Sequence, residues 1–174
     1  MKTFVTICVS AMLTALEMIC GNMGLALGLP VYAAIYFGAA FGLSYGVCAA
    51  GIAGLLLDVA YDRTWLFSPL LYVGVMLFTC QTISRSARQM PGSPLAAGGI
   101  CGALLLCGVL ARTYICRTAL PGPDILSLAV FHISGGSIFM LAITAMFDAV
   151  NFRSDLPRFC RRDTGRNFSG GQLP

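Results

Sequence analysis

Few side chains in this chain could perform acid–base chemistry or bind a metal ion. The 174 residues include seven Asp or Glu and one histidine, and Glu17, Asp58 and Asp148 lie in or beside long apolar stretches. No carboxylates pair at a shared predicted depth, no serine–histidine–aspartate set is present, and one histidine is too few for a histidine-based zinc site. We therefore expect a protein that is not an enzyme and has no metal or cofactor.

Asp58 raises the sharpest question, because it ends a stretch that carries no charged residue from Leu25 to Leu57. An ionisable group inside a bilayer is costly and usually faces protein or water. At the outer end of a helix its carboxylate could reach interfacial water or pair with Arg63 or Arg112. Alternatively, it fixes the loop that follows or binds a partner. Both interpretations stay open on the sequence.

Two other ionisable residues have simpler interpretations. Glu17 lies near the end of the first apolar stretch, where it could extend to the interface or pair with Arg112 or Arg117. His132 is the single histidine and lies within the last apolar stretch. We expect its side chain to be satisfied by packing inside a helix bundle.

The composition indicates a membrane protein. Hydrophobic residues make up 57% of the chain, charged residues 10%, and the mean hydropathy is +0.83. Soluble domains carry about 25% charged residues, and a soluble protein of this length could not bury so much apolar surface in one core. The expected fold is an all-α integral membrane protein with no nucleic-acid partner.

Six segments approach the roughly 20 residues that a membrane-spanning helix needs. They cover residues 4–20, 25–42, 45–60, 69–86, 94–111 and 125–147. The second and third are separated only by glycines, so one long tilted helix there would give five spans. Residues 1–150 are thus the expected transmembrane domain, and the polar residues 151–174 are an expected disordered tail.

Positive charge is distributed unequally between the two sides of a six-span arrangement. Basic residues mark the cytoplasmic side of membrane proteins, which places both termini in the cytoplasm here. The cytoplasmic side then holds Lys2, Arg85, Arg88, Arg153, Arg158, Arg161, Arg162 and Arg166, and the outer side holds Arg63, Arg112 and Arg117. The five tail arginines, from Arg153 to Arg166, could bind anionic lipid, or could serve only to anchor the topology.

Small residues recur at every fourth position along the second and third segments. Such spacing puts them on one helix face, where a neighbouring backbone can approach closely. The row consists of Gly38, Gly42, Gly46, Ala50 and Gly54, and it ends at Asp58. It predicts helix packing within the chain or, alternatively, a face for a partner protein.

The stretch from Gly51 to Phe78, GIAGLLLDVAYDRTWLFSPLLYVGVMLF, resembles the rod shape-determining membrane protein MreD family. That family shows a glycine pair, a leucine-rich turn, an aspartate, a short outer loop, and then a Pro-Leu and Leu-Tyr helix. The matching residues here are Gly51, Gly54, Leu55, Leu56, Asp58, Pro69, Leu70, Leu71 and Tyr72. The family usually has glycines in the loop after the aspartate. This chain instead has Trp65 and Phe67 there.

The resemblance implies a non-catalytic scaffold of the bacterial cell-wall elongation machinery, located in the inner membrane. Its partner would be an MreC-like single-span protein, with the glycan polymerase and transpeptidase and, indirectly, MreB-type filaments. The candidate interface residues are Gly51, Gly54, Asp58, Tyr61, Trp65, Phe67 and Pro69. On this hypothesis, Asp58→Leu loses the partner while the protein still inserts.

A second family fits the size and hydropathy. The substrate-binding subunits of energy-coupling-factor vitamin transporters are small six-helix membrane proteins, and MreD-like proteins are thought to share their fold. Their first helix often carries an Ala-x-x-x-Ala contact with the coupling subunit, and Ala11 and Ala15 have that spacing. A substrate site would also need polar and aromatic side chains that converge from several outer helix ends. Glu17, Asp58, Trp65 and Arg117 could supply some of these.

Overall fold

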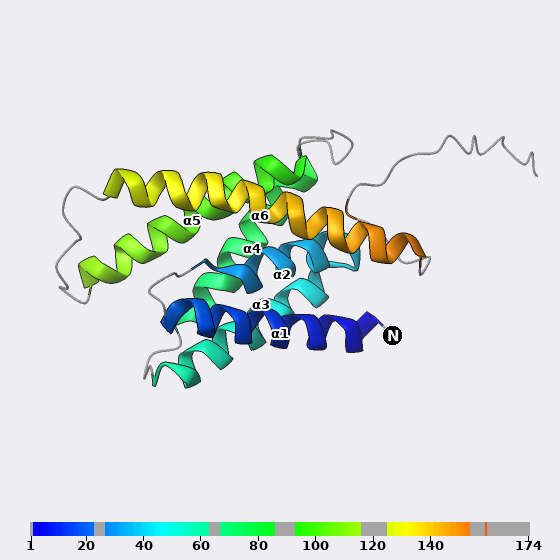
Figure 1. Cartoon of the computed structure of the whole chain (residues 1–174), viewed down its shortest axis with the longest axis horizontal. Coiled ribbons are helices and arrows are strands. Elements are labelled where there is room, and N and C mark those ends of the chain that lie inside the picture. The colour runs from blue at the N-terminus through cyan, green and yellow to red at the C-terminus, as the bar shows by residue number, and fades with distance from the viewer. Residues whose placement is uncertain are drawn as a thin grey trace, which may run out of the picture.

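The computed structural model describes residues 2–22, 27–62, 67–85, 93–115, 125–153 and 159. Over these residues the chain is all-helical. The six helices are α1 (Lys2–Asn22), α2 (Leu29–Ala40), α3 (Leu43–Ala60), α4 (Phe67–Arg85), α5 (Ser93–Ile115) and α6 (Ile125–Arg153). They form one elongated bundle (Figure 1), with the start of α1 and the end of α6 at the same end.

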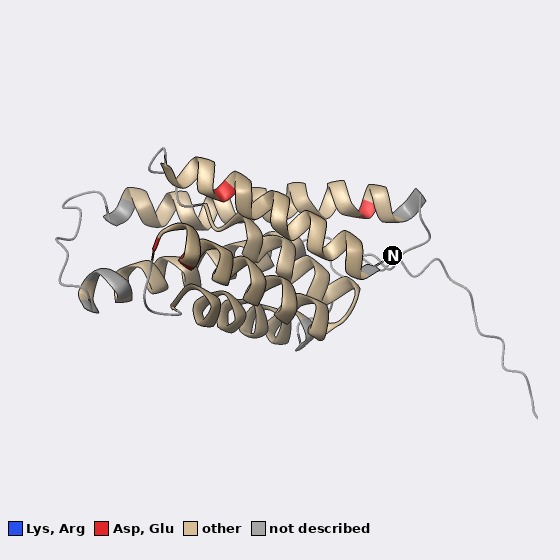
Figure 2. Ribbon diagram, turned by 90° about the horizontal axis from the view of Figure 1, so that it is seen from below, with Lys and Arg blue, Asp and Glu red and all other residues tan. Residues whose placement is uncertain are grey.

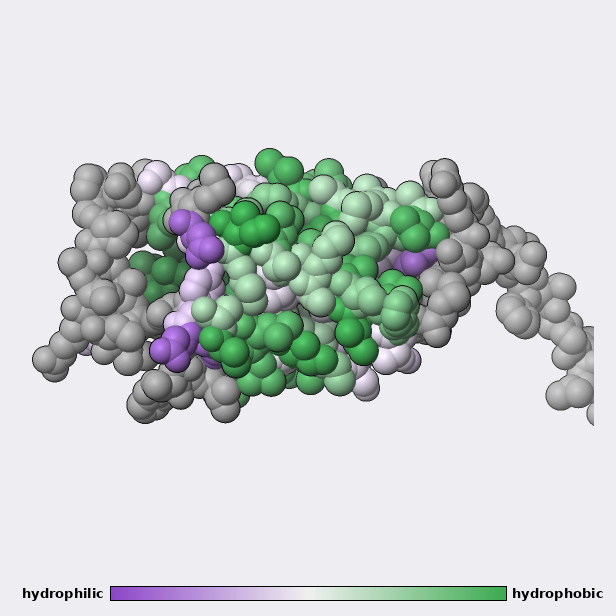
Figure 3. All heavy atoms as spheres, turned by 60° about the horizontal axis from the view of Figure 1, so that its bottom comes forward, coloured by the Kyte–Doolittle hydropathy of each residue, from purple (hydrophilic) through white to green (hydrophobic). Residues whose placement is uncertain are grey.

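Four helices are long and apolar enough to cross a bilayer, over Thr3–Asn22, Leu43–Ala60, Pro94–Ala111 and Ser127–Asn151. The expectation of a helical membrane protein is confirmed at this level. Apolar residues cover the middle of the face shown in Figure 3. Exposed apolar side chains include Phe4 and Met12 on α1 and Ile138 on α6. Acidic residues lie toward the ends of the bundle (Figure 2). An apolar surface between polar ends is what a bilayer requires.

The second predicted segment differs from its expected form. α2 has 12 residues, which span about 18 Å at 1.5 Å per residue, whereas the hydrocarbon core is about 30 Å thick. Its residues from Leu29 to Gly38 are all buried, and it packs against α1, α3, α4 and α6. α2 is therefore the central helix of the bundle, enclosed by longer neighbours.

α2 and α3 are two helices, not one long tilted helix. Between them Gly42 adopts a φ of 120°, a conformation that a residue with a Cβ rarely takes, so the chain reverses there. Gly42 does not belong to the packing row in which its spacing placed it, because an added Cβ would meet no heavy atom within 4 Å outside its chain neighbours.

The other small residues of the row lie between helices. An added Cβ on Gly46 would stand 2.8 Å from the Ala34 carbonyl oxygen and from the Gly38 Cα, so α2 and α3 meet backbone to backbone. Ala50 is fully buried. Gly38 and Gly46 therefore let α3 pack against α2, and the absence of larger side chains makes that approach feasible.

The predicted boundary at residue 150 differs from the structure in two places. α6 continues to Arg153, and Phe159 is only 4% exposed. The Phe159 ring stacks on Tyr36 at a centroid distance of 6.1 Å. This part of the predicted disordered tail is therefore built into the core. Arg158, Arg161, Arg162 and Arg166 lie outside the described residues.

Candidate functional site

Glu17 and Asp58 are two buried carboxylates at one end of the bundle, and both accept backbone N–H groups at the start of a helix. Glu17 is 4% exposed, and its two oxygens accept the backbone N–H groups of Gly28 and Leu29 at 2.9 and 3.1 Å. The first N–H groups of a helix have no partner within it, and the helix dipole favours a negative charge there. Glu17 on α1 therefore caps the start of α2, and its carboxylate does not extend to the interface as expected.

Asp58 likewise accepts a backbone N–H group at the start of a helix. Its side chain is 2% exposed, and its Oδ2 accepts the N–H of Ser68 at 3.2 Å, in the first turn of α4. The interpretation that Asp58 reaches interfacial water is wrong, because burial removes the carboxylate from solvent. The carboxylate instead joins the end of α3 to the start of α4. Arg63 and the side chain of Arg112, the alternative partners of Asp58, lie outside the described part of the chain.

Gly54 and Pro69 bring α3 and α4 together beside this bond. A Cβ added to Gly54 would lie 2.5 Å from both the N and Cα atoms of Pro69, and a backbone cannot shift out of the way as a flexible side chain can. Gly54 and Asp58 were expected to receive a partner, but both are buried within this chain. Gly51 is partly exposed on the same helix.

Tyr61 closes the end of α3 onto α1. Its hydroxyl donates to the Met18 carbonyl oxygen at 3.4 Å, and a Cβ on Gly21 would overlap that hydroxyl. Glycine at position 21 therefore gives the tyrosine room to cross α1. Trp65, the remaining aromatic candidate of the outer loop, lies outside the described residues.

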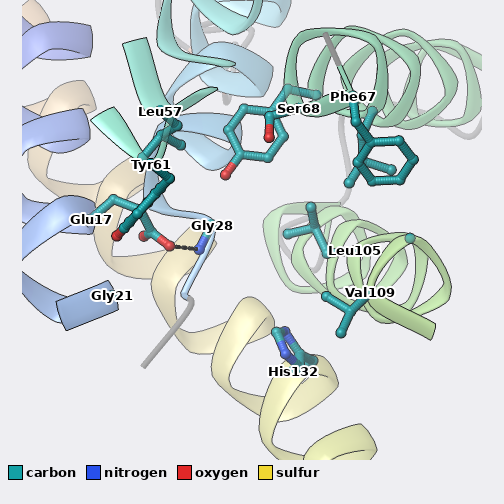
Figure 4. Close-up of a pocket in the computed structure, with 13 residues that line it drawn as sticks. Glu17, Gly21, Gly28, Leu57, Tyr61, Phe67, Ser68, Leu105, Val109 and His132 are labelled. Carbon is teal, nitrogen blue, oxygen red and sulfur yellow. Dashed lines mark hydrogen bonds between the residues drawn. The ribbon is translucent and has the colours of Figure 1, made fainter. Parts of the chain in front are cut away.

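A cavity of about 230 Å³ lies beside these caps (Figure 4). Its polar contributors are Glu17, Tyr61, Ser68, Tyr72 and His132, and its apolar contributors include Leu57, Phe67, Leu71, Leu105 and Val109. They come from α1, α3, α4, α5 and α6. The sequence suggested Glu17, Asp58, Trp65 and Arg117 for a convergent site, of which Trp65 and Arg117 lie outside the described residues. Glu17 reaches the cavity wall, whereas Asp58 is not among the lining residues.

Sequence reasoning missed His132 as a site residue. It predicted a histidine satisfied by packing, and the residue is 7% exposed. Yet no hydrogen bond joins its imidazole to the described residues, and it faces the cavity in Figure 4. A signal was present in the row Gly98, Gly102 and Gly135–Gly136, which predicts close approach of α5 to α6 around this histidine.

The described residues contain no group of three or more His, Cys, Asp or Glu that could hold a metal ion. The carboxylates at this end accept backbone N–H groups from helix starts, which suits them to structure. Comparison with protein-family models, curated proteins and solved structures finds no match to this chain.

Proposed function

We propose that this chain is a non-catalytic membrane scaffold of the bacterial cell-wall elongation machinery, which binds an MreC-like single-span protein. One observation carries the proposal. The stretch 51–78, which resembles the MreD family, folds as a hairpin of α3 and α4 whose characteristic residues contact one another. Asp58 accepts the Ser68 N–H, and Gly54 lies against Pro69. The motif residues thus build a rigid element.

The partner would bind the outer face of this hairpin. Val59 is 79% exposed, and Leu55, Leu56 and Leu70 are also exposed, beside the buried Gly54 and Asp58. Helices associate in a bilayer through close van der Waals packing, and a rigid apolar face suits that purpose. In the cell this protein would link its partner to the glycan polymerase, the transpeptidase and, indirectly, MreB-type filaments, with both termini in the cytoplasm.

The test is purification from native membranes in mild detergent, followed by mass spectrometry of the co-isolated proteins. The variant is Val59→Trp, and the matched control is Val130→Trp, which changes an exposed valine on α6. We expect wild type and Val130→Trp to retain a single-span coiled-coil protein, and Val59→Trp to lose most of it. Equal recovery by Val59→Trp contradicts the proposed face, and no such protein with wild type contradicts the function.

Asp58→Leu, the variant that the sequence suggested, no longer isolates partner binding. It would remove the acceptor of the Ser68 N–H and disturb α4 itself. Asp58→Asn keeps an oxygen at that position, so it is the better companion variant. We expect it to retain the partner, because the proposed contact lies on the exposed side of α3.

The second candidate is a substrate-binding subunit of a vitamin transporter. Two observations favour it: Ala11 and Ala15 are both exposed on α1, and a cavity lies at one end of the bundle. Ligand pockets for drug-sized molecules measure about 300–1,000 Å³, and this cavity is smaller, so the scaffold ranks first. Co-isolation of a membrane coupling subunit with ATPases would reverse that order.

A further inference from the structure

Close packing of α5 on α6 and the ring of Phe131 fix the position of His132. α5 approaches α6 so closely at this level that a Cβ on Gly102 would overlap the His132 carbonyl oxygen. The ring of Phe131 meets the imidazole edge-on, at a centroid distance of 6.0 Å. The backbone that carries the imidazole is therefore fixed, and the side chain is presented to the cavity in a defined position (Figure 4).

The His132 imidazole has a hydrogen-bonding capacity that the described part of the chain does not use. Its nitrogens are not among the enclosed polar atoms that lack a partner, so a molecule in the cavity can reach them. His132 is nine-tenths buried, lines the cavity, and has no hydrogen bond to the described residues. A neutral imidazole both donates and accepts, so a molecule in the cavity could use either nitrogen.

The aromatic and aliphatic side chains that line the cavity favour a small, flat, apolar molecule. Phe67 and Tyr72 contribute aromatic rings, and Leu105 and Val109 contribute aliphatic side chains. At about 230 Å³ the space suits a single ring with one polar substituent, because it falls below the size of pockets for drug-sized ligands.

The charge of the site favours an uncharged ligand. The carboxylate of Glu17 is in the wall, and its oxygens already accept the N–H groups of Gly28 and Leu29. An anion in the cavity would face the Glu17 carboxylate, and a cation would compete with the start of α2 for that carboxylate.

We propose that this cavity binds a compact, uncharged aromatic molecule that carries an amide or a ring nitrogen, and that His132 is its hydrogen-bonding partner. The site does not depend on the scaffold proposal, because it faces the interior at one end of the bundle, whereas the partner face is on the outside of α3. Co-isolation experiments test one, and ligand binding to the purified chain tests the other.

The experiment measures the thermal unfolding temperature of the purified full-length protein in detergent, with benzamide or nicotinamide as probes. Benzoate, the anion matched to benzamide in shape, is the control compound. At a concentration ten times Kd, we expect either neutral probe to raise Tm by roughly 3 °C, with benzoate having no effect. No shift with either neutral probe, or an equal shift with benzoate, overturns the proposal.

Variants then locate the site. Val109→Phe fills the cavity and should abolish the shift, whereas Val130→Phe adds the same bulk to an exposed position on α6 and should retain it. His132→Leu should weaken binding at least tenfold, and His132→Gln, which keeps a donor and an acceptor, should restore part of it. An undiminished shift in Val109→Phe places the probe elsewhere and overturns the site, even if the His132 variants fail to fold.

Discussion

The two ends of the bundle use carboxylates in contrasting surroundings. At the carboxylate end, defined by Glu17 and Asp58, each side chain accepts N–H groups from the start of another helix, and a cavity remains beside them. At the aromatic end, defined by Tyr36, Asp148 and Phe159, one carboxylate oxygen accepts both the Tyr36 hydroxyl, at 2.7 Å, and the Phe159 N–H, at 2.9 Å.

Aromatic rings fill the space at the aromatic end. Tyr36 lies 5.2 Å from Phe147 and 6.1 Å from Phe159 between ring centroids, and its hydroxyl also accepts from Asn151 at 2.9 Å. The difference shows that a buried carboxylate by itself does not mark a functional site. The aromatic end is filled by side chains of this chain, whereas at the carboxylate end a cavity remains, lined by an imidazole with no hydrogen bond to the described residues.

Replacing Glu17 should have the largest effect. Glu17→Leu leaves two buried N–H groups at the start of α2 without acceptors, and α2 is the central helix. Because hydrogen bonds to a charged group contribute about 1.5–3 kcal/mol each, we expect a loss of about 4 kcal/mol. For a chain of this length that lowers Tm by roughly 10 °C, measured by thermal unfolding in detergent.

The matched control for this variant is Glu17→Gln. Its amide oxygen can accept one of the two N–H groups, so the loss should be about half as large. If Glu17→Leu and Glu17→Gln both unfold at the wild-type temperature, the cap does not stabilise α2, and the contrast between the two ends disappears.

Phe159→Ala should have the next largest effect, at the opposite end. Removing a buried phenylalanine costs about 3 kcal/mol, which would show that Phe159, beyond the end of α6 at Arg153, belongs to the folded core. Phe4→Ala, at an exposed position on α1, is the control and should change Tm little. A small, equal change in both variants would mean that Phe159 adds nothing to the stability of the aromatic end.

The sequence predicted the helices well, because long apolar stretches bounded by charges, glycines and prolines are a local signal. It predicted the existence of α2 but not its length or its central position. A buried helix and a lipid-facing helix are equally apolar, so composition does not separate them. The sequence shows a glycine at position 42 but does not predict that the helix breaks there, because the φ of Gly42 depends on how α2 and α3 pack.

The candidate site was harder to predict for a related reason. Glu17 and Asp58 were identified as unusual, but their acceptor roles depend on helix starts 10 to 12 residues along the chain. We expected arginine partners because no residue type indicates that its backbone N–H group is available to a distant carboxylate. The burial of Phe159 was equally difficult to predict, since it is one aromatic residue in a polar tail.

Tyr36→Phe should have the smallest effect and is the most informative about the aromatic end. The variant keeps the ring stack but removes the hydroxyl that donates to Asp148 and accepts from Asn151, at a cost of about 2 kcal/mol because one of these bonds is to a charged group. Tyr45→Phe is the control, because no hydrogen bond joins that hydroxyl to the described residues.

Combining Tyr36→Phe with Phe159→Ala completes a double-mutant cycle. If the two residues act as one unit through Asp148, their effects should depart from additivity by more than about 0.5 kcal/mol. Strict additivity would mean that the Tyr36 hydroxyl and the Phe159 ring contribute independently to the stability of the aromatic end.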